Sequence, residues 1–361
     1  MKAVCILGTR AEAVKFAPLI IELKKRRDPG CVVVLTGQHG RAAERVLASY
    51  GVRAHYDLES DGSRGLGLTA ARIISRLTPV LMSESPSCAL VQGDTVSALA
   101  GAVAAFFLGI PVFHVEAGLR TGDPRAPFPE EAARAMIARV ASLNFAPDRI
   151  AAENLCTENV PGEIHTVGNT VADALALDWN YGPPPFFRGR PAVIVTSHRR
   201  ENIGEPLINI CDAVAQLSAS HPEYEYIFPV HPNPAVSSIV GERLSRVPGV
   251  RVIPALGVRE MHSLLLRSHL IMTDSGGLCE EGAIAGVPVI VLRSRTERVS
   301  LEQSGKLLVS GVERAGIISA FERLCDPALY MKMKCARDPV CECGASARIV
   351  GIMSEYLHKV N

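Results

Sequence analysis

The stretch 272–277, Met-Thr-Asp-Ser-Gly-Gly, contains the residue types of a phosphate-binding turn. A short apolar run of strand length leads into it, and Asp274 and Ser275 lie where that strand would end. Gly276 and Gly277 allow backbone N–H groups to approach a ligand closely, and a helix that follows presents its positive end to anions. The stretch therefore predicts a diphosphate site. In the alternative interpretation, Asp274 and Ser275 only cap the helix.

Two carboxylates, Glu280 and Glu281, follow this turn and are expected in the first turn of a helix whose small-residue run is 282–286. Carboxylates repel a phosphate group unless one of them turns away to bind hydroxyl groups. The ribose of a nucleotide carries two adjacent hydroxyl groups that fit this role. The pattern therefore favours a nucleotide diphosphate, although glutamates that only offset the helix dipole would give the same sequence.

Charged side chains also gather where the strands of the first half are expected to end. Arg10 and Lys15 follow the first strand and could hold phosphate or sugar oxygens. Asp94, Glu116 and Glu130 follow later strands. Helix capping explains one such carboxylate more easily than three that project into one cleft.

Two histidines follow successive strands of the second half. His198 lies in Thr-Ser-His-Arg-Arg-Glu-Asn, and His231 lies in Pro-Val-His-Pro-Asn-Pro. Either one alone could be a structural core histidine, but their matching positions favour a role in a site. Met261, which precedes the phosphate-binding turn, could lie under a nucleotide base.

Strand-like and helix-like runs alternate along the whole chain, and this alternation predicts parallel sheets covered by helices on both faces. The fold class is therefore α/β, with two Rossmann-like doubly wound parallel-sheet domains. Ligands of such sheets bind beyond the carboxyl ends of the strands, so we expect an inter-domain cleft. The predicted strands are 3–7, 31–35, 89–91, 112–115, 143–145, 164–167, 192–196, 226–230, 250–254, 269–272 and 288–292, and the predicted helices include 11–27, 41–50, 96–108, 130–141, 150–157, 206–218 and 259–267.

A change of composition divides the two halves. Residues 179–191 contain a run of three prolines, aromatic residues and glycines without periodicity, which indicates a linker. The N-terminal domain is then 1–178 and carries the three carboxylates. The C-terminal domain is 192–344 and carries the nucleotide site.

Composition excludes several classes of function. The 361 residues carry a net charge of +1, which favours neither a nucleic-acid nor a membrane partner. The uncharged run 95–113 is interrupted by glycine and proline and fits a buried helix better than a bilayer span. The N-terminus reads as a first strand and not as a signal peptide. Ten scattered cysteines suit the reducing cytoplasm. Cys341 and Cys343 match no common zinc spacing, and no metal is indicated.

Several motifs are missing. No Gly-x-Gly-x-x-Gly follows the first strand, and the chain has no Walker lysine motif and no Gly-x-Ser-x-Gly sequence. Nicotinamide chemistry and serine hydrolysis are therefore disfavoured.

Taken together, the motifs resemble those of the non-hydrolysing UDP-N-acetylglucosamine 2-epimerases, in register from residue 3 to about 310. The motifs that carry the resemblance are Gly8-Thr-Arg10, Glu12-Ala-Val-Lys15, Thr36-Gly-Gln-His39, Gly93-Asp-Thr95, His114-Val-Glu116, Pro129-Glu-Glu131, Gly168-Asn-Thr-Val171, His198-Arg-Arg-Glu201, His231-Pro-Asn-Pro234, Thr273-Asp-Ser-Gly-Gly277, Glu280-Glu281 and Thr296-Glu-Arg298. The resemblance implies a GT-B fold that binds UDP with the second domain and inverts the sugar at C2. It also implies that a C-terminal helix, 345–358, packs back on the first domain.

The family mechanism implied here is reversible elimination of UDP to a 2-acetamidoglucal, followed by re-addition. By resemblance, the acid–base set is Asp94, Glu116 and Glu130, with the faces of the sugar unassigned. His198 and Arg10 would stabilise the leaving diphosphate. The remaining roles would fall to the backbone amides of Ser275, Gly276 and Gly277, to Glu281 at the ribose, and to Lys15, His231, Met261 and Arg298 around the substrate. No cofactor or metal is required. The partner is a UDP-amino sugar, whose identity stays open, and the chain is expected to form a cytoplasmic homodimer.

Some positions depart from the family pattern. Ala11 replaces a usual proline, Cys279 replaces a common glutamine, Val299 follows Thr296-Glu-Arg298 in place of proline, and the segment 338–344 differs from the usual loop. Some bacterial members bind a second substrate molecule as an activator through the Gln-His loop. Gln38 and His39 are retained as possible allosteric residues, but Gly40-Arg41 and Arg64-Gly65 differ. We therefore expect weak or absent activation by substrate.

Three alternatives share the predicted nucleotide site. A GT-B glycosyltransferase would transfer the sugar to an acceptor and has no need for three first-domain carboxylates. A hydrolysing epimerase would release UDP and free N-acetylmannosamine. A non-catalytic nucleotide-sugar binder would leave the C2 hydrogen untouched.

Overall fold

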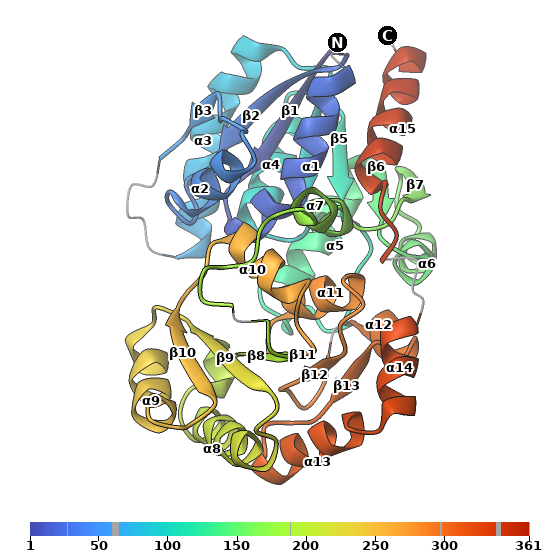
Figure 1. The fold of residues 1–361 in the computed structure, drawn as a ribbon. Helices are drawn as coiled ribbons and strands as arrows, with labels where there is room; N and C mark the ends of the chain where they lie inside the picture. The colour runs from blue at the N-terminus through green and yellow to red at the C-terminus, as the bar shows by residue number, and fades with distance from the viewer. Residues whose placement is uncertain (27, 60–64, 188, 297, 337–340, 361) are drawn as a thin grey trace. The chain divides into compact units, whose positions relative to one another are not determined.

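The computed structural model describes residues 1–26, 28–59, 65–187, 189–296, 298–336 and 341–360 (Figure 1). Arg64, Glu297 and residues 338–340, which the sequence motifs include, lie outside the described residues. The chain divides into two compact units. Unit 1 consists of residues 1–177 and 342–361, and unit 2 consists of residues 178–341. No helix in the described ranges has both the length and the apolar character needed to cross a bilayer.

Unit 1 is built on a parallel sheet with the strand order β3-β2-β1-β4-β5-β6-β7. The predicted doubly wound parallel sheet is thereby confirmed. The strands that the structure describes here are β1 (Lys2–Leu7), β2 (Gly30–Leu35), β3 (Tyr56–Asp57), β4 (Cys88–Gln92), β5 (Val112–Val115), β6 (Ala141–Ala146) and β7 (Glu163–Thr166). Most of them are apolar along their whole length because helices cover both faces of the sheet.

The helices of unit 1 follow the strands in alternation. They are α1 (Arg10–Arg26), α2 (Ala42–Ser49), α3 (Leu66–Glu84), α4 (Val96–Phe107), α5 (Glu130–Val140), α6 (Arg149–Thr157), α7 (Thr170–Asp178, whose last residue belongs to unit 2) and α15 (Ala345–Val360). The uncharged run at 95–113 forms α4 and β5, and α4 packs against α3 and α5. Helix α3 was not predicted. It buries Ile73, Leu77 and Leu81 at helical spacing in spite of an internal proline, Pro79.

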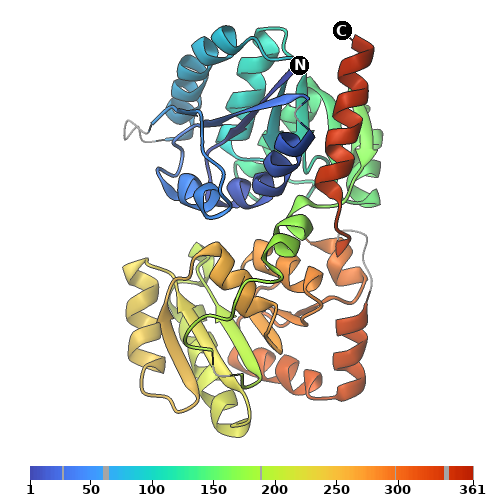
Figure 2. The same ribbon diagram turned by 45° about the horizontal axis from the view of Figure 1, so that its top comes forward.

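The last helix belongs to unit 1 and runs beside α1, as Figures 1 and 2 show. It buries Ile349, Val350, Met353 and Leu357. The ring of Tyr356 on α15 contacts Phe113 of β5 edge to face, at 5.4 Å between centroids. Residues separated by most of the chain therefore share one core.

Unit 2 contains a second parallel sheet with the strand order β10-β9-β8-β11-β12-β13. Its described strands are β8 (Ala192–Thr196), β9 (Glu225–Val230), β10 (Val250–Pro254), β11 (Leu270–Thr273), β12 (Val289–Val291) and β13 (Leu307–Val309). The helical segments are η1 (Arg200–Asn202), α8 (Glu205–Ser220), α9 (Pro234–Leu244), α10 (Val258–Leu265), α11 (Gly276–Ile284), α12 (Val299–Gln303), α13 (Arg314–Leu324) and α14 (Pro327–Cys335).

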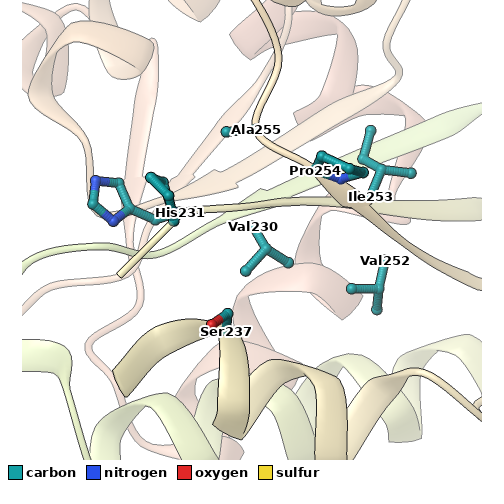
Figure 3. Close-up of a pocket in the computed structure, with 8 residues that line it drawn as sticks. Val230, His231, Ser237, Val252, Ile253, Pro254 and Ala255 are labelled. Carbon is teal, nitrogen blue, oxygen red and sulfur yellow. The ribbon is translucent and has the colours of Figure 1, made fainter. Parts of the chain in front are cut away.

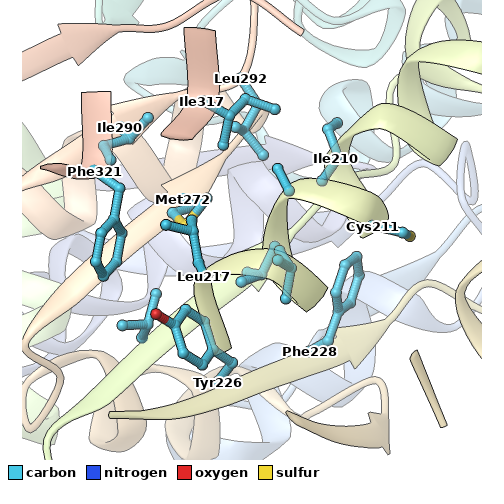
Figure 4. Packing of buried hydrophobic residues seen from close by; sticks show 14 of the residues in the cluster. Ile210, Cys211, Leu217, Tyr226, Phe228, Met272, Ile290, Leu292, Ile317 and Phe321 are labelled. Carbon is cyan, nitrogen blue, oxygen red and sulfur yellow. The ribbon is translucent and has the colours of Figure 1, made fainter. Parts of the chain in front are cut away.

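A core cluster of unit 2 lies between this sheet and helices α8 and α13. Figure 4 shows Leu217, Tyr226, Phe228, Met272 and Phe321 packed together within it. The aromatic rings of Tyr226 and Phe321 lie 6.1 Å apart. This packing fixes the strands whose carboxyl ends carry the residues discussed next.

Candidate functional site

The turn after β1 has no room for a side chain at Gly8. A Cβ atom there would lie 1.9 Å from Thr36 Oγ1 and 2.2 Å from Ser97 Oγ. Glu12 closes the turn, because its carboxylate accepts hydrogen bonds from the N–H groups of Gly8 at 3.0 Å and Thr9 at 2.8 Å. The glycine and the buried carboxylate therefore fix the backbone from which Arg10 and Lys15 project.

Glu12 also connects this turn to the loop that carries Asp94, because Thr95 Oγ1 donates to Glu12 Oε1 at 2.7 Å. Burial raises the pKa of Glu12 to about 7, although these hydrogen bonds oppose the change. Glu12 belongs to a motif of the family resemblance but was assigned no role of its own. The pattern Thr9-x-x-Glu12 is a helix capping box and could have predicted that its carboxylate lies at this turn.

Lys15 and Glu116 form an ion pair at the carboxyl edge of the sheet. Gln92 Nε2 donates to the Glu116 carboxylate at 2.8 Å, and Asn169 Nδ2 donates at 3.2 Å. Glu116 has a φ of 61°, a left-handed conformation that is uncommon for a residue other than glycine and occurs often at functional sites. The structure thus brings together two residues that the sequence placed 101 positions apart.

Asp94 lies next to this pair and binds Arg134 of α5. A Cβ atom on the preceding Gly93 would lie 3.4 Å from Glu116 Oε2, so the turn and the carboxylate are neighbours. Arg134 also approaches Glu131 at 3.4 Å. Sequence reasoning missed Arg134, since its partner is 40 residues away and no local motif contains both.

Glu130 is the first residue of α5 and lies one helical turn before Arg134, on the same helix face. Its side chain is partly exposed and makes no hydrogen bond or ion pair with the other described residues. Asp94, Glu116 and Glu130 therefore lie in one neighbourhood of unit 1. Arg10 is exposed at the start of α1 and likewise has no polar partner within the described part of the chain.

The two possible allosteric residues differ in their surroundings. Gln38 Oε1 accepts hydrogen bonds from the Ser97 N–H at 2.9 Å and from Ser97 Oγ at 2.6 Å. Gln38 therefore ties its loop to the start of α4. His39 is exposed on the same loop.

In unit 2, Asp274 is fully buried and organises the end of β8. Its carboxylate accepts hydrogen bonds from Ser197 Oγ at 2.8 Å, from the N–H of His198 at 2.9 Å, from the N–H of Arg199 at 3.0 Å and from Asn202 Nδ2 at 2.9 Å. Burial opposes its ionisation, yet the bonds from His198, Arg199 and Ser197 lower the pKa of Asp274 to about 2. Asp274 is therefore a fixed anion that positions the His198 backbone.

The imidazole rings of His198 and His231 stack, with 5.7 Å between centroids and 17° between planes. A pocket of about 380 Å³ lies beside His231 at the ends of β9 and β10 (Figure 3). The lining is mainly apolar and includes Val230, Val252 and Pro254. The structure thus combines two nitrogen-bearing rings and an apolar recess at one edge of the sheet.

The predicted phosphate-binding turn leads into α11, which begins earlier than predicted, at Gly276. Ser275 is the N-cap and accepts a hydrogen bond from the Leu278 N–H at 3.4 Å, which is the capping role of the alternative interpretation. Gly276 and Gly277 are the first residues of the helix, where N–H groups have no acceptor within the helix. Glu280 and Glu281 therefore lie in the second turn of α11, and the prediction that placed both in the first turn is wrong.

The two glutamates of α11 have different environments. Glu280 is buried, and its Oε1 lies 2.7 Å from Arg298 Nε. Glu281 Oε2 lies 3.7 Å from Nε2 of the buried His262, whose Nδ1 is 2.7 Å from Asp178 Oδ2. Burial opposes protonation, but these two carboxylates raise the pKa of His262 to about 9. Met261, next to this histidine, is largely buried.

Glu280 is compatible with an anion at the turn, because its charge is paired with that of Arg298. His262 was missed, since a buried histidine between two acids gives no local sequence pattern.

Comparison with known proteins identifies close relatives along nearly the whole chain. The profile of a family described as UDP-N-acetylglucosamine 2-epimerase matches residues 21–354. The UDP-N-acetylglucosamine 2-epimerase of Bacillus subtilis is 37% identical over 97% of this chain and 94% of its own length. The Neisseria meningitidis protein of the same name is also 37% identical, over 94% of this chain and 95% of its own.

Solved structures agree with these relatives. The Neisseria meningitidis UDP-GlcNAc 2-epimerase bound to UDP-GlcNAc superposes with a TM-score of 0.91 at 35% identity, covering 98% of this chain and 100% of its own. The Methanocaldococcus jannaschii enzyme in complex with UDP-GlcNAc and UDP gives 0.85 at 30% identity, covering 98% and 100%. A glycosyltransferase of kitacinnamycin shares only the fold, at 14% identity and a TM-score of 0.68. The fold is thus of the GT-B type.

Proposed function

Because the chain belongs to the UDP-N-acetylglucosamine 2-epimerase family, we propose that it reversibly inverts C2 of UDP-N-acetylglucosamine to give UDP-N-acetylmannosamine. The observation that carries the mechanism is the neighbourhood of Asp94, Glu116 and Glu130 in unit 1, with Lys15 and Arg134 among them. Three carboxylates beside two cations suit proton transfer to and from a sugar carbon.

The reaction begins when a carboxylate of unit 1 removes the C2 proton. The C2–H electron pair forms a C1=C2 double bond, and UDP leaves C1 with the electrons of the C1–O bond. The intermediate is a 2-acetamidoglucal. UDP then adds back to C1 while C2 receives a proton on the opposite face. Asp94, Glu116 and Glu130 supply the acid and base groups, and Lys15 and Arg134 hold two of these carboxylates in place.

Unit 2 binds the nucleotide. The N–H groups of Gly276 and Gly277, at the start of α11, are free to donate hydrogen bonds to the diphosphate. The positive end of the helix dipole also attracts the diphosphate. His198 meets the developing negative charge on the departing diphosphate, with its backbone fixed by Asp274. Arg10, at the start of α1, is the other side chain proposed to stabilise this charge.

The remaining contacts are assigned by their chemistry. Glu281 accepts hydrogen bonds from the ribose hydroxyl groups, and His231 lines the apolar pocket of Figure 3. Met261 supports the base, and Arg298 completes the site through its ion pair with Glu280. None of these roles requires a cofactor.

Solvent deuterium provides the test of the proposed reaction. Incubation with UDP-N-acetylglucosamine in deuterated buffer should replace the C2 proton with deuterium in both epimers, as followed by NMR. Retention of the C2 proton would contradict the proposal. Release of free N-acetylmannosamine would indicate a hydrolysing epimerase, and sugar transfer that depends on an added acceptor would indicate a glycosyltransferase.

Weak or absent activation by substrate is proposed as a further property. It is supported by Gly40-Arg41, which follow the retained Gln38 and His39 and differ from the family pattern. Kinetics with UDP-N-acetylmannosamine alone should start without a long lag. A lag abolished by a trace of the gluco epimer would contradict this.

The chain is proposed to act as a homodimer in the cytoplasm, where reduced cysteines persist. Unit 1 exposes Phe106 and Phe107 at the end of α4, with 51% and 75% of their surfaces accessible, and Met136 on the adjacent α5 is 50% exposed. Exposed apolar patches of this kind often mark interfaces. Light scattering should give the mass of a dimer, and a monomer mass at micromolar concentration would contradict this.

A further inference from the structure

Three side chains of different metal-binding type meet at the edge of unit 2 where its strands begin. They are His221, Glu322 and Cys325, which we name the zinc triad, and their ligand atoms lie within 4.8 Å of one another. His221 Nε2 is 3.0 Å from Glu322 Oε1. His221 is the C-cap of α8 and Cys325 is the C-cap of α13, two helices that lie side by side in Figures 1 and 2.

The imidazole of His221 is oriented from both sides. Its Nδ1 lies 3.4 Å from Glu223 Oε1, while its ring packs on Phe321 with 5.1 Å between centroids. Metal-bound histidines commonly donate one ring N–H to a carboxylate, which fixes the tautomer and leaves the other nitrogen for the metal. Nε2 faces Glu322 at 3.0 Å and donates its N–H to that carboxylate, which can only accept. A metal ion would take the place of this proton between Nε2 and Glu322, with Glu223 as the carboxylate that accepts from Nδ1–H.

The local electrostatics favour a cation. Helices α8 and α13 both end here, so the negative ends of their dipoles lie near the carboxylates of Glu223 and Glu322 and add to their negative charge. A divalent cation bound here would stabilise the Cys325 thiolate directly.

We propose that the zinc triad binds a zinc ion, with water as the fourth ligand. Nitrogen, sulfur and carboxylate oxygen are the donors that zinc prefers, whereas magnesium and calcium require oxygen. Zinc bonds of about 2.0 to 2.3 Å would bring the donor atoms to roughly 3 to 4 Å from one another, which requires only small side-chain movements. On binding, the Cys325 thiol releases its proton to solvent.

The bound ion would cross-link the ends of α8 and α13. This edge of the sheet is opposite to the phosphate-binding turn, which follows the carboxyl end of β11, and a strand length of roughly 15 to 20 Å separates the two edges. Zinc at the triad would therefore stabilise unit 2 against unfolding and leave the epimerase reaction unchanged.

Cobalt(II) titration of the full-length protein tests this assignment, because a thiolate bound to cobalt gives a charge-transfer absorption in the near ultraviolet. The wild type should develop this absorption to a stoichiometry of one ion. Cys325→Ser should abolish it. Cys156→Ser, which removes another exposed thiol, should leave it intact. Glu223→Gln should weaken zinc binding by about 10-fold to 100-fold in competition with a chelator.

Two further measurements test whether Cys325→Ser loses the absorption only because it is misfolded. Cys325→Ser should keep the wild-type kcat, and zinc should raise the melting temperature of the wild type and of Cys156→Ser but not that of Cys325→Ser. A wild-type protein without the absorption, or an absorption that persists in Cys325→Ser, would overturn the proposal.

Discussion

Replacing Asp274 with asparagine should both destabilise unit 2 and slow catalysis. The carboxylate is fully buried and accepts hydrogen bonds from Ser197, His198, Arg199 and Asn202. An asparagine keeps one acceptor oxygen, but its NH₂ group must face one of these donors. The substitution therefore removes the negative charge and leaves at least one buried donor unsatisfied.

The loss of stability expected for Asp274→Asn can be worked out from the hydrogen bonds of Asp274 and from its pKa. Bonds to a charged group contribute roughly 1.5 to 3 kcal/mol each and neutral ones roughly 0.5 to 1.5, so the loss over this cluster is about 3 kcal/mol. The pKa of Asp274 falls from the usual 3.8 to about 2, which corresponds to about 2 kcal/mol of stabilisation. Because the folded-state value is the lower one, this stabilisation is present above pH 4 and is lost as the pH falls toward 2.

Urea unfolding followed by circular dichroism between pH 2 and pH 7 measures both quantities. Asp274→Asn should be less stable than the wild type at pH 7, and the difference should shrink as the pH falls from 4 to 2. Its kcat should also fall, because His198 loses the anchor of its backbone. Asp212→Asn is the matched control, since it removes a partly exposed partner of Arg243 and should cost at most about 1 kcal/mol.

Equal unfolding free energies for Asp274→Asn and the wild type would refute this reasoning. So would a stability difference that stays constant across the acid range, because the buried carboxylate would then contribute nothing through its ionisation.

Three other outcomes are expected. Gly8→Ala should lower the free energy of unfolding by about 1 to 3 kcal/mol and remove much of the activity, because the new Cβ clashes with Thr36 and Ser97. Gly67→Ala is the control: its new Cβ meets open space, so thermal denaturation should show a neutral or stabilising effect. Glu130→Gln should lower kcat by about 10² to 10⁴ in a coupled assay with unfolding unchanged, and a normal kcat would exclude Glu130 from the acid–base set. His262→Gln should lower the free energy of unfolding by about 3 kcal/mol below pH 6.5. Because the pKa of His262 is raised to about 9 in the folded state, this loss of stability should disappear as the pH rises through 9. A loss of stability that does not change with pH in urea unfolding would count against this.

The sequence predicted most of the strands, because a parallel sheet buried on both faces leaves continuous apolar runs. The strands at 112–115, 192–196 and 250–254 have the bounds that the pattern predicted. Helix α3 was missed because Gly67 and Pro79 interrupt its helical composition. Helices α9 and α12 to α14 and strand β13 were also not predicted. The sequences of these elements are short and mixed in composition, so tertiary packing determines whether they form a helix or a strand.

The candidate site could be predicted only in part. Strand ends located the carboxylates of unit 1, since those ends share one edge of the sheet. Partners distant in sequence could not be predicted, as Arg134 with Asp94 shows. Asp274 was interpreted as a residue of the turn itself, and only the fold reveals that it holds the neighbouring strand end.

The return of α15 to unit 1 has a consequence for synthesis on the ribosome. Unit 2 lies between residues 177 and 342, so all of its residues are translated before the helix that completes the core of unit 1. Until then, the surface that will cover Ile349, Val350, Met353 and Leu357 stays open to water and to chaperones. Unit 2 can fold first although it comes second, and α15, which is translated after all of unit 2, closes the first unit.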